Sequence, residues 1–188
     1  MIMLRLITIF LLLSLNLNSY AGIPTKEEPK HDSVSSASGY VKDSHISDDP
    51  KERAVIITNL CKFVDRNQHE KFFALLAEQQ LRLERIYQEI DCGELQGESL
   101  MHVVLNKVSS ALPTGKKIIA YFKRLKAKHP KADIAAIFNK QYSKGTILDA
   151  LQDRRTFYGD GAPEKIKANL TQLESLLREV GAKTSSAG

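Results

Sequence analysis

The thiols of Cys61 and Cys92 have the most versatile chemistry in this sequence, because a thiol can act as a nucleophile, a metal ligand or half of a disulfide. The chain has no other cysteine. Neither residue belongs to a C-x-x-C pair or stands beside a histidine, which argues against catalysis. In an oxidising compartment a bridge between them would stabilise the fold by roughly 3 to 4 kcal/mol. We therefore predict a disulfide between Cys61 and Cys92, with buried free thiols as the alternative.

The other reactive side chains form no catalytic or metal-binding pattern. The five histidines are dispersed, and the sequence has no G-x-S-x-G, no H-E-x-x-H and no glycine-rich phosphate loop. Glu84 and Glu89 offer two carboxylates, as glycosidases use, but charged residues on helical faces are usually solvated. We expect a protein that is not an enzyme and that needs neither a cofactor nor a metal.

Residues 1–21 have the pattern of a secretory signal peptide. Arg5 precedes an apolar run of about ten residues, and the small residues Ser19 and Ala21 stand at the −3 and −1 positions of a cleavage site before Gly22. An uncleaved membrane anchor is the alternative, but this run is shorter than the ~20 residues of a spanning helix. We expect a cleaved, bacterial export product that is periplasmic or secreted and not stably inserted in a membrane.

Residues 22–50 have the composition of a disordered linker, since they are rich in charged residues, serine and proline and contain almost no large apolar side chains. Residues 185–188 are expected to form a disordered tail. The chain has 27 basic and 22 acidic residues, a formal net charge of +5. This excess is too small and too scattered to predict a nucleic-acid partner.

The densest group of positive charges lies within residues 116–131. Its members are Lys116, Lys117, Lys123, Arg124, Lys126, Lys128 and Lys131. The simplest interpretation is the solvated face of an amphipathic helix. An acidic protein surface or an anionic membrane as the partner is the alternative.

Apolar residues recur at spacings of three and four from residue 51 onward, which is typical of amphipathic helices. This spacing predicts a first helix pair over residues 54–64 and 72–76, joined by a tight turn at 65–68. The stretch 81–96 is more apolar than a plain loop, and an additional helical turn is expected there.

Two further helix pairs follow. In the second pair, Pro113 and Gly115 are interpreted as the turn between the helices. In the third pair, residues 159–163 form the expected turn, and Gly181 is the expected terminator of the last helix.

A short phrase occurs twice, at residues 97–105 and again at residues 145–151. In both copies a glycine comes shortly before a hydroxyl residue, Ser99 or Thr146, and before a leucine that opens a short apolar helix. Phrases of this kind are typical of stacked helical repeats, which usually bind proteins.

These phrases resemble the ankyrin repeat family. His102 stands at the histidine of the family's T-P-L-H-x-A phrase. Residues 125–151 resemble the end of one unit, its hairpin and the start of the next. Residues 176–184, a leucine pair followed by Gly-Ala and a polar tail, are similar to the segment that closes many ankyrin arrays. The resemblance implies an all-α fold over residues 51–184, a short ankyrin-like solenoid of about three helix pairs.

The chain also departs from the family. The interval from Gly97 to Gly145 is 48 residues, whereas the family period is about 33. This difference predicts extra structure between the second and third units. In addition, the proline that follows the hydroxyl residue in the family is replaced by Leu100 and Ile147.

The resemblance implies a binding surface rather than a reaction. It makes Ser99, His102 and Thr146 internal hydrogen-bonding positions. It places the contacts to a protein partner on the hairpins, the turn between helices and the exposed face of the first helices. The residues predicted to contact a partner are Glu94, Gln96, Glu98, Gln141, Tyr142, Lys144 and Tyr158.

Two classes of function fit these expectations. The first is an exported, non-enzymatic adaptor or inhibitor of another protein, for example an immunity protein against a secreted toxin. The second is a structural or stress-related envelope protein, or a secreted host-directed effector that uses the same surface. In either case we expect a monomer or a weak homodimer.

Overall fold

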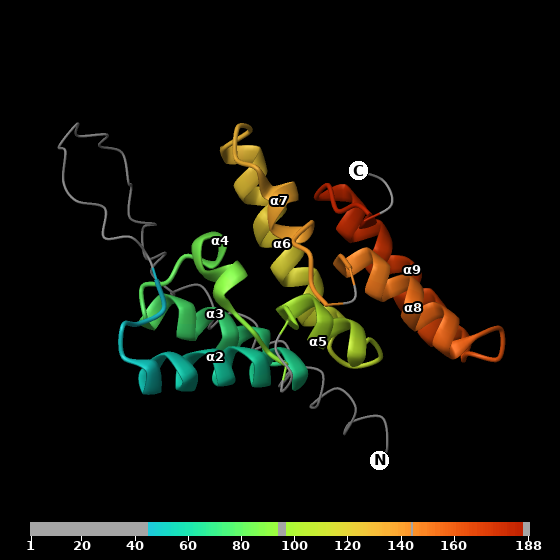
Figure 1. Ribbon diagram of the computed structural model, residues 1–188, viewed down its shortest axis with the longest axis horizontal. Coiled ribbons are helices and arrows are strands. Elements are labelled where there is room, and N and C mark those ends of the chain that lie inside the picture. Colours follow the sequence, from blue (N-terminus) through green and yellow to red (C-terminus); the bar gives the residue numbers. More distant parts are fainter. Residues whose placement is uncertain (1–44, 94–96, 144, 186–188) are drawn as a thin grey trace, which may run out of the picture. The chain divides into compact units, whose positions relative to one another are not determined.

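The computed structural model describes residues 45–93, 97–143 and 145–185 (Figure 1). Within these ranges the chain forms eight α-helices and one short 3-10 helix and has no β-strand. The prediction of an all-α protein is therefore confirmed. No helix of these ranges is long and apolar enough to cross a membrane. The expected signal peptide 1–21 and most of the expected linker lie outside the described residues.

Six of the helices form three consecutive pairs. The pairs are α2 (Pro50–Asp65) with α3 (His69–Glu78), α5 (Leu100–Asn106) with α6 (Leu112–Lys128), and α8 (Ile147–Tyr158) with α9 (Glu164–Glu179). Short helices occupy the connections between pairs: α4 (Leu83–Ile86) and η1 (Tyr87–Glu89) follow α3, and α7 (Ile134–Phe138) follows α6. The additional turn expected within residues 81–96 is thus present.

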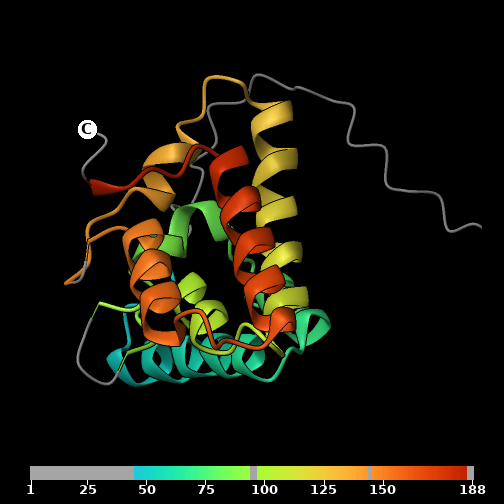
Figure 2. The ribbon, with the colours of Figure 1, turned by 90° about the vertical axis from the view of Figure 1, so that its right-hand side faces the viewer.

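The helices pack in two rows. The two helices of each pair contact one another, and equivalent helices of successive pairs are also in contact. The first helices follow the order α2, α5, α8, and the second helices follow the order α3, α6, α9. Figure 2 shows α9 between α8 and α6. Each pair thereby buries its apolar stripe against the pair beside it, which no single pair could do alone.

The first helix begins before residue 51. Asp49 caps α2 by accepting a hydrogen bond from the backbone N–H of Lys51 at 2.8 Å, and Pro50 occupies the first turn, where no donor is needed. Ile46 is buried in the core. The folded domain therefore includes the last residues of the segment 22–50.

The interpretation of Pro113 and Gly115 as a turn is wrong, because both residues lie in the first turn of α6. Proline is tolerated there, since the first N–H groups of a helix have no intrahelical partner. Gly115 is buried, and a Cβ atom at this position would lie 2.7 Å from Cγ1 of Val104 in α5. The glycine thus permits the close approach of α5 and α6.

The two connecting segments share a pattern that the sequence analysis did not recognise. Each has an apolar residue, then two other residues, then isoleucine and an aromatic residue. All of these apolar side chains are buried: Leu83, Ile86 and Tyr87 in the first segment, and Ile134, Ile137 and Phe138 in the second.

The aromatic members of the two segments meet in the core. The ring centroids of Tyr87 and Phe138 are 5.6 Å apart, and both rings contact Phe122 of α6, at 5.5 and 5.2 Å. The long helix α6 and the connecting helix α7 account for the 48-residue interval between Gly97 and Gly145. The extra structure predicted there is therefore part of the packed core.

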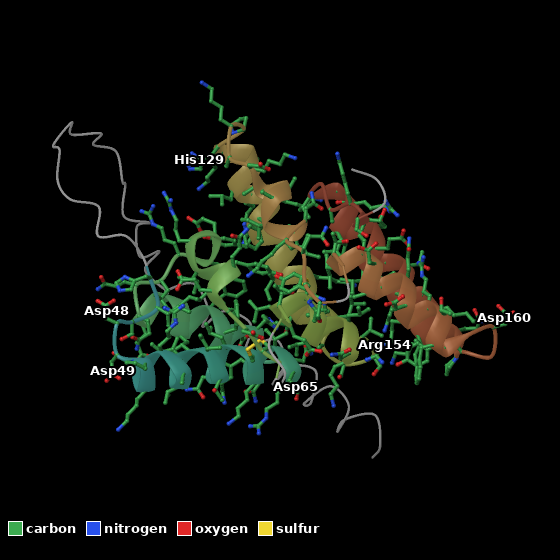
Figure 3. The ribbon with its side chains drawn as sticks, viewed as in Figure 1. Asp48, Asp49, Asp65, His129, Arg154 and Asp160 are labelled. Carbon is green, nitrogen blue, oxygen red and sulfur yellow. A yellow bond between two sulfur atoms is a disulfide. The ribbon has the colours of Figure 1, made fainter. Side chains whose placement is uncertain are left out.

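A disulfide joins Cys61 of α2 to Cys92, which follows η1, so the predicted pairing is confirmed (Figure 3). The two Cα atoms are 5.6 Å apart. The bond ties the first helix pair to the segment that leads into α5. It therefore fixes this segment against α2 independently of the helix packing.

Candidate functional site

Ser99 and His102 lie at the start of α5, where their polar atoms bond to one another. Nδ1 of His102 accepts a hydrogen bond from the backbone N–H of Ser99 at 3.1 Å and lies 2.9 Å from the Ser99 hydroxyl oxygen. Both side chains are buried. A nucleophilic serine needs an accessible hydroxyl, so the geometry supports the predicted internal role of this pair.

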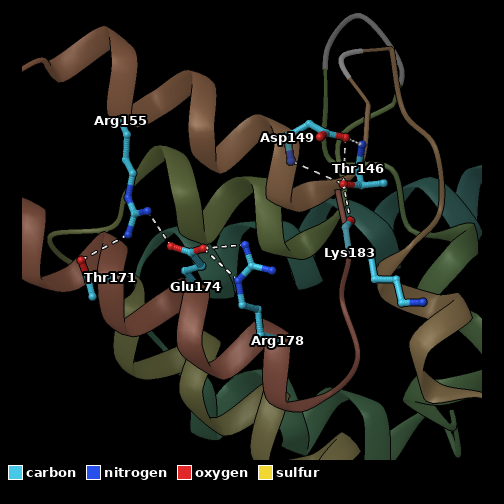
Figure 4. A network of polar contacts seen from close by, with 7 residues as sticks. All are labelled: Thr146, Asp149, Arg155, Thr171, Glu174, Arg178 and Lys183. Atoms are coloured by element: carbon cyan, nitrogen blue, oxygen red, sulfur yellow. Dashed lines mark hydrogen bonds and ion pairs between the residues drawn. The ribbon is translucent and has the colours of Figure 1, made fainter. Parts of the chain in front are cut away.

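Thr146 and Asp149 repeat this arrangement at the start of α8 (Figure 4). The Asp149 carboxylate accepts the backbone N–H of Thr146 at 2.7 Å, and the Thr146 hydroxyl accepts the backbone N–H of Asp149 at 3.4 Å. The same hydroxyl lies 2.8 Å from the backbone carbonyl of Lys183, to which it donates. This capping box therefore also holds the segment after α9 against α8.

The Asp149 carboxylate receives further donors from the end of the domain. The backbone N–H of Ser185 lies 3.0 Å from Oδ2 of Asp149. Partial burial alone would raise the pKa of Asp149, but the hydrogen bonds from Thr146 and Ser185 outweigh it and lower the pKa below its usual value. The negatively charged carboxylate of Asp149 thus joins α8 to the C-terminal segment.

Asp91 organises the loop before α5 in a similar way. Its carboxylate accepts the backbone N–H groups of Gly93, Gly97 and Glu98 at 3.0, 2.7 and 3.1 Å. Desolvation acts to raise the pKa of Asp91, but these donors favour the charged form and the pKa is lowered. One carboxylate therefore binds both ends of the loop before α5, next to the backbone hydrogen bond from Cys92 to Glu98 at 2.7 Å.

The loop before α5 and the hairpin before α8 lie beside each other. Tyr142 pairs with Gly145 in the hairpin, and the Tyr142 ring packs edge-on against His102, with ring centroids 4.8 Å apart. A Cβ atom at Gly97 would lie 3.9 Å from the backbone nitrogen of Ser143. Two segments predicted to contact a partner are thus adjacent.

A groove of about 310 Å³ lies between the first helices α5 and α8. Its floor and walls are formed by Glu98, His102, Leu105, Asn106, Ala150, Asp153, Arg154 and Phe157. The carboxylates of Glu98 and Asp153 take part in no ion pair within the described part of the chain. The groove therefore combines apolar surface with charged groups that are available to a partner.

Arg154 spans this groove. Its Nη2 atom donates to Oδ1 of Asn106 at 2.6 Å, and Figure 3 shows Arg154 on the side of α8 that faces α5. The guanidinium lies over the rings of Phe157 and Tyr158, at 5.9 and 5.7 Å from their centroids. Phe157 is 76% exposed. Arginine and large aromatic residues are enriched at the energetic centres of protein interfaces, so this cluster has the composition of an anchor for a partner.

A second groove, of about 290 Å³, lies between α2 and α5. It shares Glu98 and Asn106 with the first groove, so these two residues form the ridge between them. The ion pair between Lys107 and Asp65, at 4.0 Å, crosses it. We call the surface of α2, α5 and α8 that contains both grooves the first-helix face.

The residues predicted to contact a partner are distributed around the first-helix face. Glu98 lines both grooves. Tyr158 ends α8 and packs against Arg154. Gln141 is exposed and Tyr142 half-buried on the hairpin, and neither lines a groove. The other predicted residues, Glu94, Gln96 and Lys144, lie outside the described residues.

Four residues of α8 that line the first groove were not among the predicted contact residues. Ala150, Asp153, Arg154 and Phe157 follow one another at spacings of three, one and three, which places them on one side of a helix. The buried side chains of α8 occupy other positions. An exposed aromatic residue on an otherwise polar helical side was the available signal.

The carboxylates of Glu84 and Glu89 are each held by a separate partner. Glu84 accepts a hydrogen bond from the Tyr121 hydroxyl, and Glu89 pairs with Arg53 at 2.9 Å. Burial, and then the Glu84 carboxylate, raise the pKa of Tyr121 above its usual range. Among the described residues, no group of three or more His, Cys, Asp or Glu side chains is placed to hold a metal ion.

No protein-family model, curated protein or solved structure matches this sequence. The function must therefore be inferred from the arrangement of the residues. The first-helix face is the part of the described structure in which exposed aromatic, charged and recessed apolar groups occur together.

Proposed function

We infer that this chain is an exported, non-enzymatic protein-binding module that acts as an adaptor or inhibitor of another protein. The observation that carries the inference is the groove between α5 and α8. It brings Arg154, clamped by Asn106 and two aromatic rings, next to the exposed ring of Phe157. Groups held in place before binding lose little conformational entropy when a partner docks, which favours affinity.

The ankyrin-like architecture is part of this proposal. Three helix pairs with first helix against first helix and second against second are the packing expected of a short solenoid. The hydrogen-bonded pairs Ser99 with His102 and Thr146 with Asp149 occupy equivalent positions at the starts of α5 and α8. In this arrangement these pairs stabilise the helix starts, and the first-helix face and the neighbouring hairpins are accessible to a partner.

The disulfide supports the proposed location of the protein outside the cytoplasm. Structural disulfides persist in oxidising compartments such as the periplasm or the extracellular space. The pairing of Cys61 with Cys92 therefore agrees with the secretory pattern of residues 1–21, which predicts export.

A capture experiment with matched variants tests the proposal. Immobilised mature protein is incubated with an envelope extract of the encoding organism, and retained proteins are identified by mass spectrometry. Phe157→Ala should abolish retention of the specific partner. Val55→Ala is the control, because Val55 of α2 is also exposed, at 59%, but lies outside both grooves. Equal retention by both variants would contradict the assignment of partner binding to the groove between α5 and α8.

A further inference from the structure

A third cavity lies away from the first-helix face, between α4 and the end of α6 with α7. Its volume is about 480 Å³. Its apolar lining includes Leu125 of α6 together with Ile134 and Ile137 of α7. Ile134 and Ile137 are themselves buried, so the apolar surface is recessed rather than protruding. Figure 3 shows His129, another lining residue, at the end of α6 that points away from α2.

The lining of this cavity carries basic side chains from two segments, together with the carboxylates of Glu84 and Asp133. Arg82 and Arg85 come from α4 and the residue before it, and His129 comes from the end of α6. Neither Arg85 nor His129 takes part in an ion pair within the described ranges. Two segments that are far apart in the sequence therefore place basic side chains around the same apolar surface.

The carboxylates that line the cavity are already engaged. Glu84 accepts the Tyr121 hydroxyl hydrogen bond, which ties α4 to α6. Asp133 caps α7 by accepting the backbone N–H of Ala136 at 3.0 Å. These hydrogen bonds leave both negative charges in place, but neither carboxylate forms an ion pair with Arg85 among the described residues, so its guanidinium is accessible to a carboxylate from outside.

The basic residues at positions 116–131 add to the positive charge on this side of the molecule. Lys123 pairs with Glu179, but Lys126, Lys128 and Lys131 are exposed and form no ion pair in the described part of the chain. Positive charge in the last turn of α6 also complements the helix dipole, which explains part of this enrichment. It does not explain why Arg85, on another segment, lies on the rim of the same cavity.

We propose that this cavity is a second docking site, which binds an acidic, apolar peptide segment of a partner protein. A carboxylate of the segment binds Arg85 by a charge-assisted hydrogen bond, and an apolar side chain enters the recess over Leu125 and Ile137. The concave shape favours a protruding side chain over a lipid surface. Large apolar groups that could enter a bilayer are exposed at Val55 and Phe157, and neither lines this cavity.

The test uses the folded mature protein and a short acetylated peptide of glutamate and leucine residues. Binding is followed by fluorescence anisotropy and mapped by amide chemical shifts. Arg85→Glu should weaken binding at least about tenfold, because it replaces an attractive contact with a repulsive one. Lys117→Glu is the matched control: it makes the same change in net charge at an exposed position of α6 that does not line the cavity. Circular dichroism of each variant verifies that the fold is retained.

The outcomes separate the proposal from its alternatives. Shifts clustered at residues 85, 125, 129 and 137, with loss of binding in Arg85→Glu alone, support it. Equal weakening by Lys117→Glu would show general attraction to a basic surface and would overturn it. Binding to vesicles containing phosphatidylglycerol without binding to the peptide would also overturn it, in favour of an anionic membrane. Each result is independent of whether the first-helix face binds a partner.

Discussion

Arg154 of α8 and Asn106 of α5 are joined across a groove by a hydrogen bond of 2.6 Å, which links side chains of two successive helix pairs. The same guanidinium lies over Phe157 and Tyr158. An arginine restrained in this way has little rotamer freedom to lose when a partner binds. This relationship is the reason for assigning partner binding to the first-helix face rather than to the hairpins alone.

Ser99→Ala should lower the free energy of unfolding and leave the exposed surface of the protein unchanged. The substitution removes the hydroxyl next to Nδ1 of His102 at the buried start of α5. Loss of such a capping group costs about 1 kcal/mol. Urea unfolding followed by circular dichroism measures the change. Ser175→Ala, at an exposed position of α9, should change the free energy of unfolding by less than about 0.5 kcal/mol; equal losses in both variants would contradict the buried capping role.

Gly115→Ala should destabilise the contact between α5 and α6. The added Cβ would lie 2.7 Å from Cγ1 of Val104, and overpacking of this kind typically costs about 1 to 3 kcal/mol. Combining it with Val104→Ala removes the clash, so the double variant should be more stable than the sum of the single effects predicts. Gly161→Ala is the control, because no atom lies within 4 Å of its Cβ position. Simple additivity in the double variant would show that α5 and α6 are not in this close contact.

Removal of the disulfide should lower the stability substantially. The bond closes a loop with a sequence separation of 31, for which the chain-entropy relation gives about 3 to 4 kcal/mol. The variant Cys61→Ala/Cys92→Ala should therefore unfold at a clearly lower urea concentration than the oxidised protein. Treatment of the wild type with dithiothreitol should reproduce the effect. A protein whose unfolding curve is unchanged by the reductant would contradict the structural role of the bond.

Acid should weaken the hydrogen bonds that the Asp149 carboxylate accepts from Thr146 and Ser185. Its pKa in the folded protein is lowered from the usual 3.8, so the native state binds the proton less tightly than the unfolded chain does. The stabilisation is complete above 3.8 and is lost as the pH falls through the lower native pKa. The stability advantage of the wild type over Asp149→Asn should therefore shrink from about pH 5 to about pH 2. A stability difference between the two proteins that stays constant over this pH range would contradict the role of the Asp149 charge.

The sequence predicted the helices better than the surfaces between them. Apolar spacing identified the three pairs, because a buried helical stripe leaves a local signal. Pro113 and Gly115 were misread, because their fit into the first turn of α6 depends on Val104 of another helix. The similarity of the segments around Tyr87 and Phe138 could have been found in the sequence, at a spacing longer than the ankyrin period of about 33 residues.

The groove between α5 and α8 could not be predicted from the sequence, because it is formed between two helices that are distant in the chain. Asn106 and Arg154 are 48 residues apart in the chain and meet only when α5 packs against α8. The sequence also left free thiols as an alternative to the disulfide, because the pairing depends on how α2 lies against the segment after η1. By contrast, the capping roles of Ser99 and Thr146 are local and could be read from the repeated phrase.

Site-specific photo-crosslinking tests the central claim most directly. A photoreactive amino acid is placed at Asp153, in the groove between α5 and α8, or at Ser175, on α9 outside both grooves. Each variant is produced in the encoding organism and irradiated. If the first-helix face binds the partner, the protein with the probe at position 153 should crosslink to one defined protein, and the protein with the probe at position 175 should not. A partner that crosslinks from position 175 and not from position 153 would contradict the assignment.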